Sequence, residues 1–115
     1  MITVKQVYKS SSPQDGYRIL VDKQWPRGVR KDVARIDEWL KDAAPSDELR
    51  RWFDYDPTRW PEFQERYEKE LEGKADLLRR LKEKMRGKDI ALLFAMEDEA
   101  HNNAVVLKNF IENLK

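Results

Sequence analysis

The stretch from Ala91 to Val106 reads ALLFAMEDEAHNNAVV, and the rest of the chain is organised around it. It opens with a short, fully apolar run that ends at Met96, and such a run is typical of a buried β-strand. Acidic residues, the only histidine (His101) and two asparagines follow, and apolar residues then return at helical spacing. The stretch therefore predicts a strand over 90–96, a polar elbow, and a last helix over about 99–114.

Both alternating sets of side chains in the 90–96 run are apolar, which a strand requires only when both of its faces are covered. A length of 115 residues fits one domain. We therefore expect a single α/β domain over residues 1–115, with a small mixed or mostly parallel sheet. The 90–96 strand is predicted to be central and flanked by helices on each side.

The other expected elements follow from periodicity and turn signals. Strands are predicted at 2–8 and 17–22, and helices at 36–44, 46–52, 61–72 and 76–85. The connection between the first two strands is short, which favours an antiparallel pair because a parallel crossover usually needs about a dozen residues or more.

Composition excludes several classes of protein. There are 23 basic and 22 acidic side chains, and this balance argues against a DNA-binding protein driven by net charge. Cysteine is absent, which excludes disulfide scaffolds, cysteine nucleophiles and thiolate zinc sites. No run approaches the roughly 18 apolar residues of a membrane helix, and no signal-peptide pattern is present. We expect a cytoplasmic protein without a membrane partner.

Acidic side chains follow two of the predicted strands, and the carboxyl ends of strands line the ligand crevice of open α/β sheets. These acids would meet near a loop containing tryptophan and arginine, forming a cleft of mixed charge. A carboxylate three or four residues before His101 could orient its imidazole for acid–base chemistry. The candidate catalytic residues are Asp22, Glu97 and His101, and the candidate ligand-binding residues are Trp25, Arg27, Arg30, Asp98 and Asn102, with Asn103 as a further polar contact.

Structural interpretations remain open for each of these residues. Acids at the start of a helix complement its dipole, and a single histidine can be a capping or surface residue. One histidine without cysteine disfavours zinc, and nothing in the spacing of Asp22, Glu97 and Asp98 demands a magnesium site. No pattern indicates a cofactor.

The leading functional hypothesis is a small-molecule enzyme or ligand-binding protein with an anion-accepting cleft at the strand ends. Arg27 and the start of the last helix would hold the anion, and Asp22, Arg27, Glu97 and His101 would share one pocket. One alternative is a nucleic-acid-binding or regulatory module that uses the basic segment from Trp25 to Arg35. Another is an interaction protein without catalysis. The sequence favours no oligomeric state.

Two motifs carry a resemblance to a known family: VDKQWPRGV at Val21–Val29 and EDEAHNNAVVL at Glu97–Leu107, with APSDELRRWF and DPTRW between them. Together they resemble the YeaO-like branch of the DUF488 family of uncharacterised prokaryotic proteins. The resemblance implies a compact α/β domain and a cytoplasmic location, and no particular activity. Relatives in the wider family carry cysteines where this chain aligns Phe94 and Asn102, and an arginine before the Trp-Pro-Arg-Gly motif where it has Lys23-Gln24. A thiol- or metal-based activity is therefore not implied here.

Overall fold

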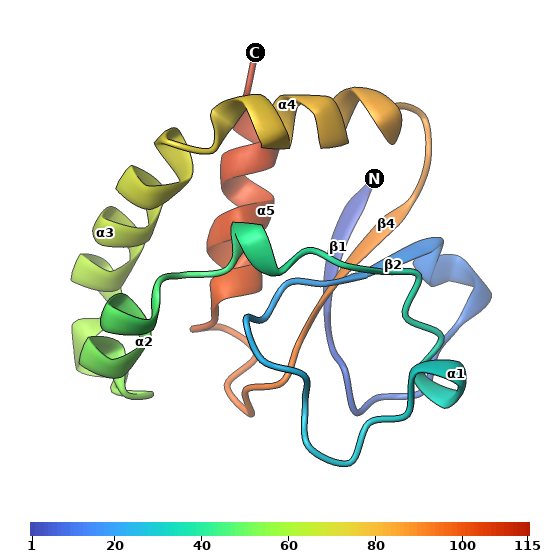
Figure 1. Cartoon of the computed structure of the whole chain (residues 1–115), viewed down its shortest axis with the longest axis horizontal. Coiled ribbons are helices and arrows are strands. Elements are labelled where there is room, and N and C mark those ends of the chain that lie inside the picture. The colour runs from blue at the N-terminus through green and yellow to red at the C-terminus, as the bar shows by residue number, and fades with distance from the viewer.

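The computed structural model describes residues 1–115 and contains one sheet of four parallel strands (Figure 1). The strands are β1 (Ile2–Gln6), β2 (Tyr17–Leu20), β3 (Glu38–Trp39) and β4 (Ile90–Phe94), in the spatial order β1-β4-β2-β3. The helices are α1 (Lys31–Ala34), α2 (Asp47–Phe53), α3 (Trp60–Glu72), α4 (Ala75–Lys84) and α5 (Asn103–Asn113), with 3₁₀ turns at Pro13–Asp15, Lys41–Ala43 and Pro57–Arg59. The predicted α/β class and the interior position of β4 are confirmed.

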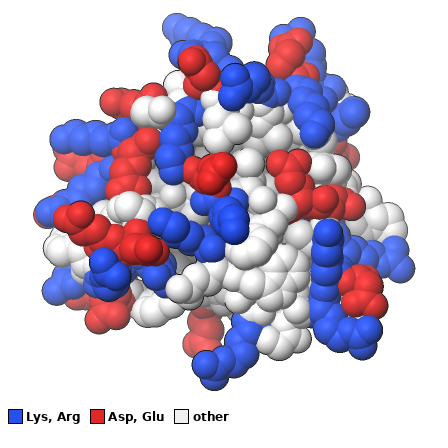
Figure 2. Space-filling view, viewed as in Figure 1, with Lys and Arg blue, Asp and Glu red and all other residues white.

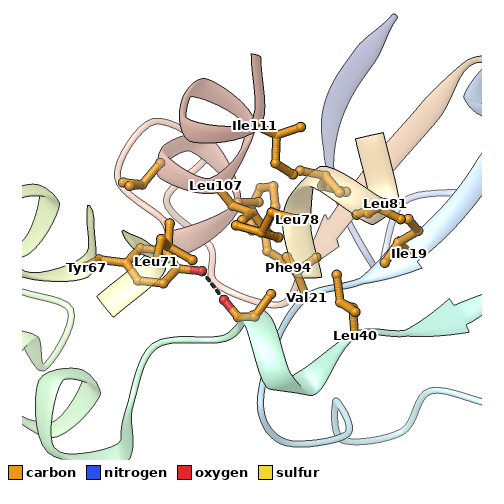
Figure 3. Packing of buried hydrophobic residues seen from close by; sticks show 14 of the residues in the cluster. Ile19, Val21, Leu40, Tyr67, Leu71, Leu78, Leu81, Phe94, Leu107 and Ile111 are labelled. Carbon is orange, nitrogen blue, oxygen red and sulfur yellow. Dashed lines mark hydrogen bonds between the residues drawn. The ribbon is translucent and has the colours of Figure 1, made fainter. Parts of the chain in front are cut away.

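All five residues of β4 are buried, and their alternation divides the interior into two cores. Ile90, Leu92 and Phe94 belong to a large core that also contains residues of α2 to α5. Figure 3 shows Phe94 of this core among residues of α3, α4 and α5. Ala91 and Leu93 face a smaller core on the other side of the sheet. A strand buried on both faces has no polar position, which explains its uniformly apolar sequence.

The two faces of the sheet are covered by different kinds of structure. The long helices cover the larger core, whereas loops and the single turn of α1 cover the smaller one (Figure 1). On that smaller side, Trp25 and Trp39 pack edge-on with ring centroids 5.3 Å apart. Most of the helical covering therefore lies on one face.

No helix has the length and apolar character needed to cross a membrane.

The predicted antiparallel pairing of the first two strands is wrong. Strand β4 lies between β1 and β2 and is parallel to both. The strands are short, so an extended connection with one 3₁₀ turn is sufficient to return the chain to the start of β2. That connection ends at Gly16, whose φ of +70° favours glycine and where a Cβ would lie 2.2 Å from the carbonyl oxygen of Asp89.

The predicted helix over 36–44 is also wrong, because this segment forms β3 and a 3₁₀ turn. Ile36 and Trp39 pack against the smaller core, whereas Leu40 belongs to the larger one. The three apolar residues therefore straddle the edge of the sheet. The predicted start of the next helix is confirmed, since the Ser46 hydroxyl accepts a hydrogen bond from the Leu49 N–H at 3.2 Å.

Candidate functional site

A cavity of about 420 Å³ lies beyond the carboxyl ends of β2 and β4, where open parallel sheets bind their ligands. The segments after both strands contribute to its lining, together with α2, α3 and the start of α5. Its lining residues are Tyr8, Asp22, Lys23, Gln24, Trp25, Pro26, Arg27, Pro45, Arg50, Phe53, Tyr55, Phe63, Ala95, Met96 and Asn103. We refer to it as the Asp22 cleft.

Asp22 connects the ends of the two inner strands. It follows β2, and its Oδ2 accepts a hydrogen bond of 2.9 Å from the backbone N–H of Ala95, which directly follows β4. Its other oxygen accepts no well-formed hydrogen bond within the protein, although the Asn103 amide, which donates to the Val21 carbonyl, approaches the carboxylate closely enough to lower its pKa. Burial raises the pKa of Asp22, and the Ala95 N–H, the Asn103 amide and the Arg50 charge offset that rise only in part. A carboxylate in this position can accept a further hydrogen bond from a ligand in the cleft.

Arg50 brings a positive charge from α2 to the same cleft. Its Nη2 contacts Asp47 at 3.2 Å, and Lys23 approaches the same carboxylate at 3.7 Å. The Nε of Arg50 is buried and donates no hydrogen bond. Arg27 lines the cleft as an exposed residue and forms no ion pair. The lining thus has three cationic side chains and one acidic side chain, which favours an anionic ligand.

Aromatic side chains form much of the wall. Phe53 and Phe63 pack with their ring centroids 4.4 Å apart and are nearly inaccessible to solvent. Tyr8 and Tyr55 are 53% and 68% exposed, respectively. The Tyr8 hydroxyl donates to the Arg27 carbonyl at 3.0 Å, which ties the end of β1 to the loop that carries Trp25.

The residue before Tyr55 ends α2 in a left-handed turn. Asp54 and Tyr55 are consecutive non-glycine residues with φ of +45° and +56°, a conformation that costs free energy for residues with a Cβ. The turn brings Tyr55 to the cleft, where its side chain remains largely in solvent.

The polar elbow is organised around Asp98 and lies outside the cleft. Its Oδ1 accepts hydrogen bonds from the backbone N–H groups of Ala100 and His101 at 2.9 and 3.0 Å. Its Oδ2 lies 2.8 Å from His101 Nδ1, and this contact, with the two N–H groups, lowers the pKa of Asp98. The His101 ring packs edge-on against Trp60 of α3, with centroids 5.2 Å apart.

Because Asp98 closes this turn, the last helix begins at Asn103 and not near residue 99 as predicted. The Asn102 side chain caps the helix by accepting from the Val105 N–H at 3.1 Å, and its amide donates to the Asp98 carbonyl at 3.0 Å. Asn102 is completely buried, so its role here is structural. Its neighbour Asn103 lines the cleft instead and donates to the Val21 carbonyl at 3.0 Å.

The structure brings together four of the residues singled out from the sequence, namely Asp22, Trp25, Arg27 and Asn103. The predicted sharing of one pocket is wrong for Glu97 and His101, because the Asp98 turn directs this segment away from the cleft. Asp98, Asn102 and Arg30 are outside the lining as well, and Arg30 pairs with Asp32 at 3.1 Å on the exposed surface.

Sequence reasoning missed six residues of the site: Tyr8, Lys23, Arg50, Phe53, Tyr55 and Phe63. The aromatic residues of α2 and α3 occupy helical positions and are indistinguishable by pattern from core residues. A usable signal was the Asp54-Tyr55-Asp56-Pro57 turn, since an exposed tyrosine in a loop between two helices needs no place in the core.

No group of three or more histidine, cysteine, aspartate or glutamate side chains is arranged to hold a metal ion. Basic and acidic side chains are interspersed over the surface, without a broad region of one sign on the face shown in Figure 2.

Comparison with known proteins connects this chain to a family. Residues 1–114 match the family DUF488-N3i, described as the inactive DUF488-N3 subclade. The chain is 36% identical over 113 residues to the uncharacterised protein YeaO of Escherichia coli K12, covering 98% of each chain. It is 49% identical over 76 residues to the uncharacterised protein Rv3073c of Mycobacterium tuberculosis H37Rv. That match covers 66% of this chain and 64% of the relative, so it spans less than two thirds of the mycobacterial protein. No solved structure matches the chain. The chain therefore belongs to the YeaO-like DUF488 proteins, in the subclade DUF488-N3i.

Proposed function

We propose that this protein binds a small anionic molecule in the Asp22 cleft and does not transform it. The observation that carries the proposal is a partly buried carboxylate whose one well-formed hydrogen bond comes from the Ala95 N–H, placed in an aromatic-walled cavity at the strand ends. Burying such a group costs stability, and a ligand that supplies the missing donor would offset that cost.

The cations of the cleft support an anionic ligand. Lys23 and Arg50 share the single carboxylate of Asp47, and Arg27 has no acidic partner. The cavity therefore has more positive than negative side chains, whereas the chain as a whole has a net charge of only +1. An excess of positive charge in a concave site raises the local concentration of negatively charged ligands.

Two observations favour binding over catalysis. The only histidine of the chain, His101, packs against Trp60 outside the cleft, so Asp22 has no imidazole partner there for proton transfer. The family to which the chain belongs is described as an inactive subclade. A cytoplasmic location, with access to small anionic metabolites, is part of this proposal.

The nucleic-acid alternative has less support. In the basic segment, Arg30 pairs with Asp32, and the charges on the face shown in Figure 2 are mixed. A protein that binds several phosphates of a nucleic acid needs a continuous basic surface.

The proposal is tested by two-dimensional amide NMR of the labelled protein, titrated with small aromatic and aliphatic carboxylates and with inorganic phosphate. We expect saturable shifts at Ala95, the Asn103 side chain and the Arg27 loop. After prolonged incubation, one-dimensional spectra should show the added compound unchanged. Shifts confined to other surfaces would overturn the proposed site, and the appearance of a product would establish an enzyme.

A further inference from the structure

The composition of the cleft points beyond charge to the shape of its ligand. Five of its lining residues are aromatic: Tyr8, Trp25, Phe53, Tyr55 and Phe63. They come from five separate places in the chain, the end of β1, the loop after β2, α2, the turn after α2, and α3. Phe53 and Phe63 are buried behind the wall, whereas Tyr8, Trp25 and Tyr55 remain accessible, and accessible rings from several elements favour a flat ligand that stacks on them.

The two tyrosine rings are exposed, unlike those of Phe53 and Phe63. Tyr8 and Tyr55 are among four large hydrophobic side chains of the chain that remain exposed, and both line the cleft. An exposed ring beside a cavity can cover a ligand at little entropic cost, since a tyrosine side chain has only two rotatable angles. The turn at Asp54 and Tyr55 has unfavourable positive φ angles, and it brings the Tyr55 ring to the cleft.

The charged groups of the cleft differ in how far they are buried. Asp22 is partly buried and has one oxygen without a well-formed hydrogen bond, whereas Lys23 and Arg27 are exposed. A ligand that satisfied both regions would present a donor to the interior and an anionic group to solvent. An aromatic ring joining the two groups would occupy the space between them.

Building on the proposed binding function, we infer that the ligand is a flat heteroaromatic acid. Its ring N–H donates to Asp22, its ring stacks on the accessible rings of Tyr8, Trp25 and Tyr55, and its anionic group pairs with Arg27 and Lys23. A bicyclic ring with one carboxylate is smaller than the cleft volume of about 420 Å³.

Two matched pairs of probes test the inference by calorimetry or ligand-observed NMR. Benzoate and cyclohexanecarboxylate carry the same charge and differ in aromaticity. Indole-2-carboxylate and benzofuran-2-carboxylate have nearly the same shape and differ in the ring N–H. We expect benzoate to bind about fivefold more tightly than cyclohexanecarboxylate. We expect indole-2-carboxylate to bind about tenfold more tightly than benzofuran-2-carboxylate.

Variants of Asp22 test whether this residue causes the preference for a ligand with a ring N–H. Asp22→Asn should reduce the preference for indole-2-carboxylate, because a hydrogen bond to a neutral amide is weaker than one to a carboxylate, and Asp22→Ala should abolish it. Asp76→Asn is the matched control, since the Asp76 side chain is 89% exposed on α4, outside the cleft, and its loss should leave both preferences intact.

The outcomes distinguish the inference from the proposal on which it rests. Equal affinities within both pairs, with shifts at the cleft, would overturn the heteroaromatic assignment and leave anion binding standing. An N–H preference that survives in Asp22→Ala would overturn the role of Asp22. Failure of all four probes and of phosphate to bind would overturn the proposed function itself.

Discussion

Asp15 and Asp22 lie at opposite ends of β2 and show what full and partial pairing do to a carboxylate. Asp15, just before the strand, accepts hydrogen bonds from the Lys5 ammonium and the Ser12 N–H, both at 3.0 Å, and pairs with the Arg18 guanidinium. Burial alone would raise its pKa, but Lys5, Ser12 and Arg18 together lower it. Asp22, just after the strand, has one backbone donor, and its pKa is raised.

The difference separates a structural group from a candidate binding group. Through Lys5 and Arg18, Asp15 attaches the connection between β1 and β2 to the sheet. Arg18 is 3% exposed and also donates to the Ala34 carbonyl at 3.0 Å. Asp22 has a hydrogen-bonding capacity that the protein leaves unused. A desolvated group with unused capacity beside a cavity is a functional candidate, whereas a desolvated group with satisfied capacity is part of the fold.

Leu93→Ala should have the largest effect on stability and sets the scale for the others. Leu93 is completely buried in the smaller core, so the free energy of unfolding should fall by about 4 kcal/mol, through lost burial and a residual cavity. Urea unfolding measures this change. A loss below about 1 kcal/mol would show that the loop-covered face is loosely packed.

Asp15→Asn should come next, at about 3 kcal/mol, because it leaves Lys5 and Arg18 without their buried counter-charge. The sign of its pH dependence follows from the lowered pKa of Asp15. The stabilisation by wild-type Asp15 is present above the ordinary value of 3.8 and is lost as the pH falls through the lowered pKa. The difference in the free energy of unfolding between wild type and Asp15→Asn should therefore decrease at acidic pH. A difference that does not change with pH would mean that the effect arises from packing.

Asn102→Ala should cost about 1–2 kcal/mol, since it removes the side-chain acceptor for Val105 at the start of α5. Asn102→Ser, which keeps a neutral acceptor at the N-cap, should retain most of this contribution. Unfolding monitored by circular dichroism compares the two variants. If both lose the same amount, the amide bond to the Asp98 carbonyl, and not the cap, is what stabilises the elbow.

His101→Ala should have the smallest effect on stability. The side chain is 38% exposed, and its pairing with Asp98 lies near the surface, where solvent screens it. Because His101 is outside the cleft, the variant should bind cleft ligands as the wild type does. A loss of stability as large as that of Leu93→Ala would make His101 a packing residue, and a loss of ligand binding would return it to the site.

The sequence predicted the features that depend on local pattern. The apolar run of β4 required burial on both faces, and Ser46 marked the start of α2. The pairing of the strands was not predictable in this way, because the connection from β1 to β2 is stabilised by Asp15, Lys5 and Arg18, residues that meet only after folding.

The candidate site was predictable mainly where the chain is extended, with Asn103 at the start of α5 as the exception. Asp22, Trp25 and Arg27 follow a strand and belong to one motif, so their proximity could be inferred from the sequence. His101 was placed in a helix that starts later than predicted, since the side chain of Asp98 holds residues 98–101 in a turn. A side-chain hydrogen bond of that kind changes the direction of a segment without changing its apolar pattern.

The most direct test of the account is the difference in unfolding free energy between wild type and Asp22→Asn as a function of pH. The amide oxygen of asparagine can still accept from Ala95, so the substitution removes mainly the charge. Because the pKa of Asp22 is raised by folding, the folded wild type carries a charge penalty at neutral pH. That penalty fades as the pH falls through the raised pKa and is absent below the ordinary value of 3.8.

We therefore predict that Asp22→Asn is more stable than wild type at neutral pH, that its advantage disappears in acid, and that Asp15→Asn shows the opposite sign in the same experiment. A variant that is less stable than wild type at neutral pH would contradict the account. Asp22 would then be a paired structural carboxylate like Asp15, and the cleft would lose the group on which its assignment as a binding site rests.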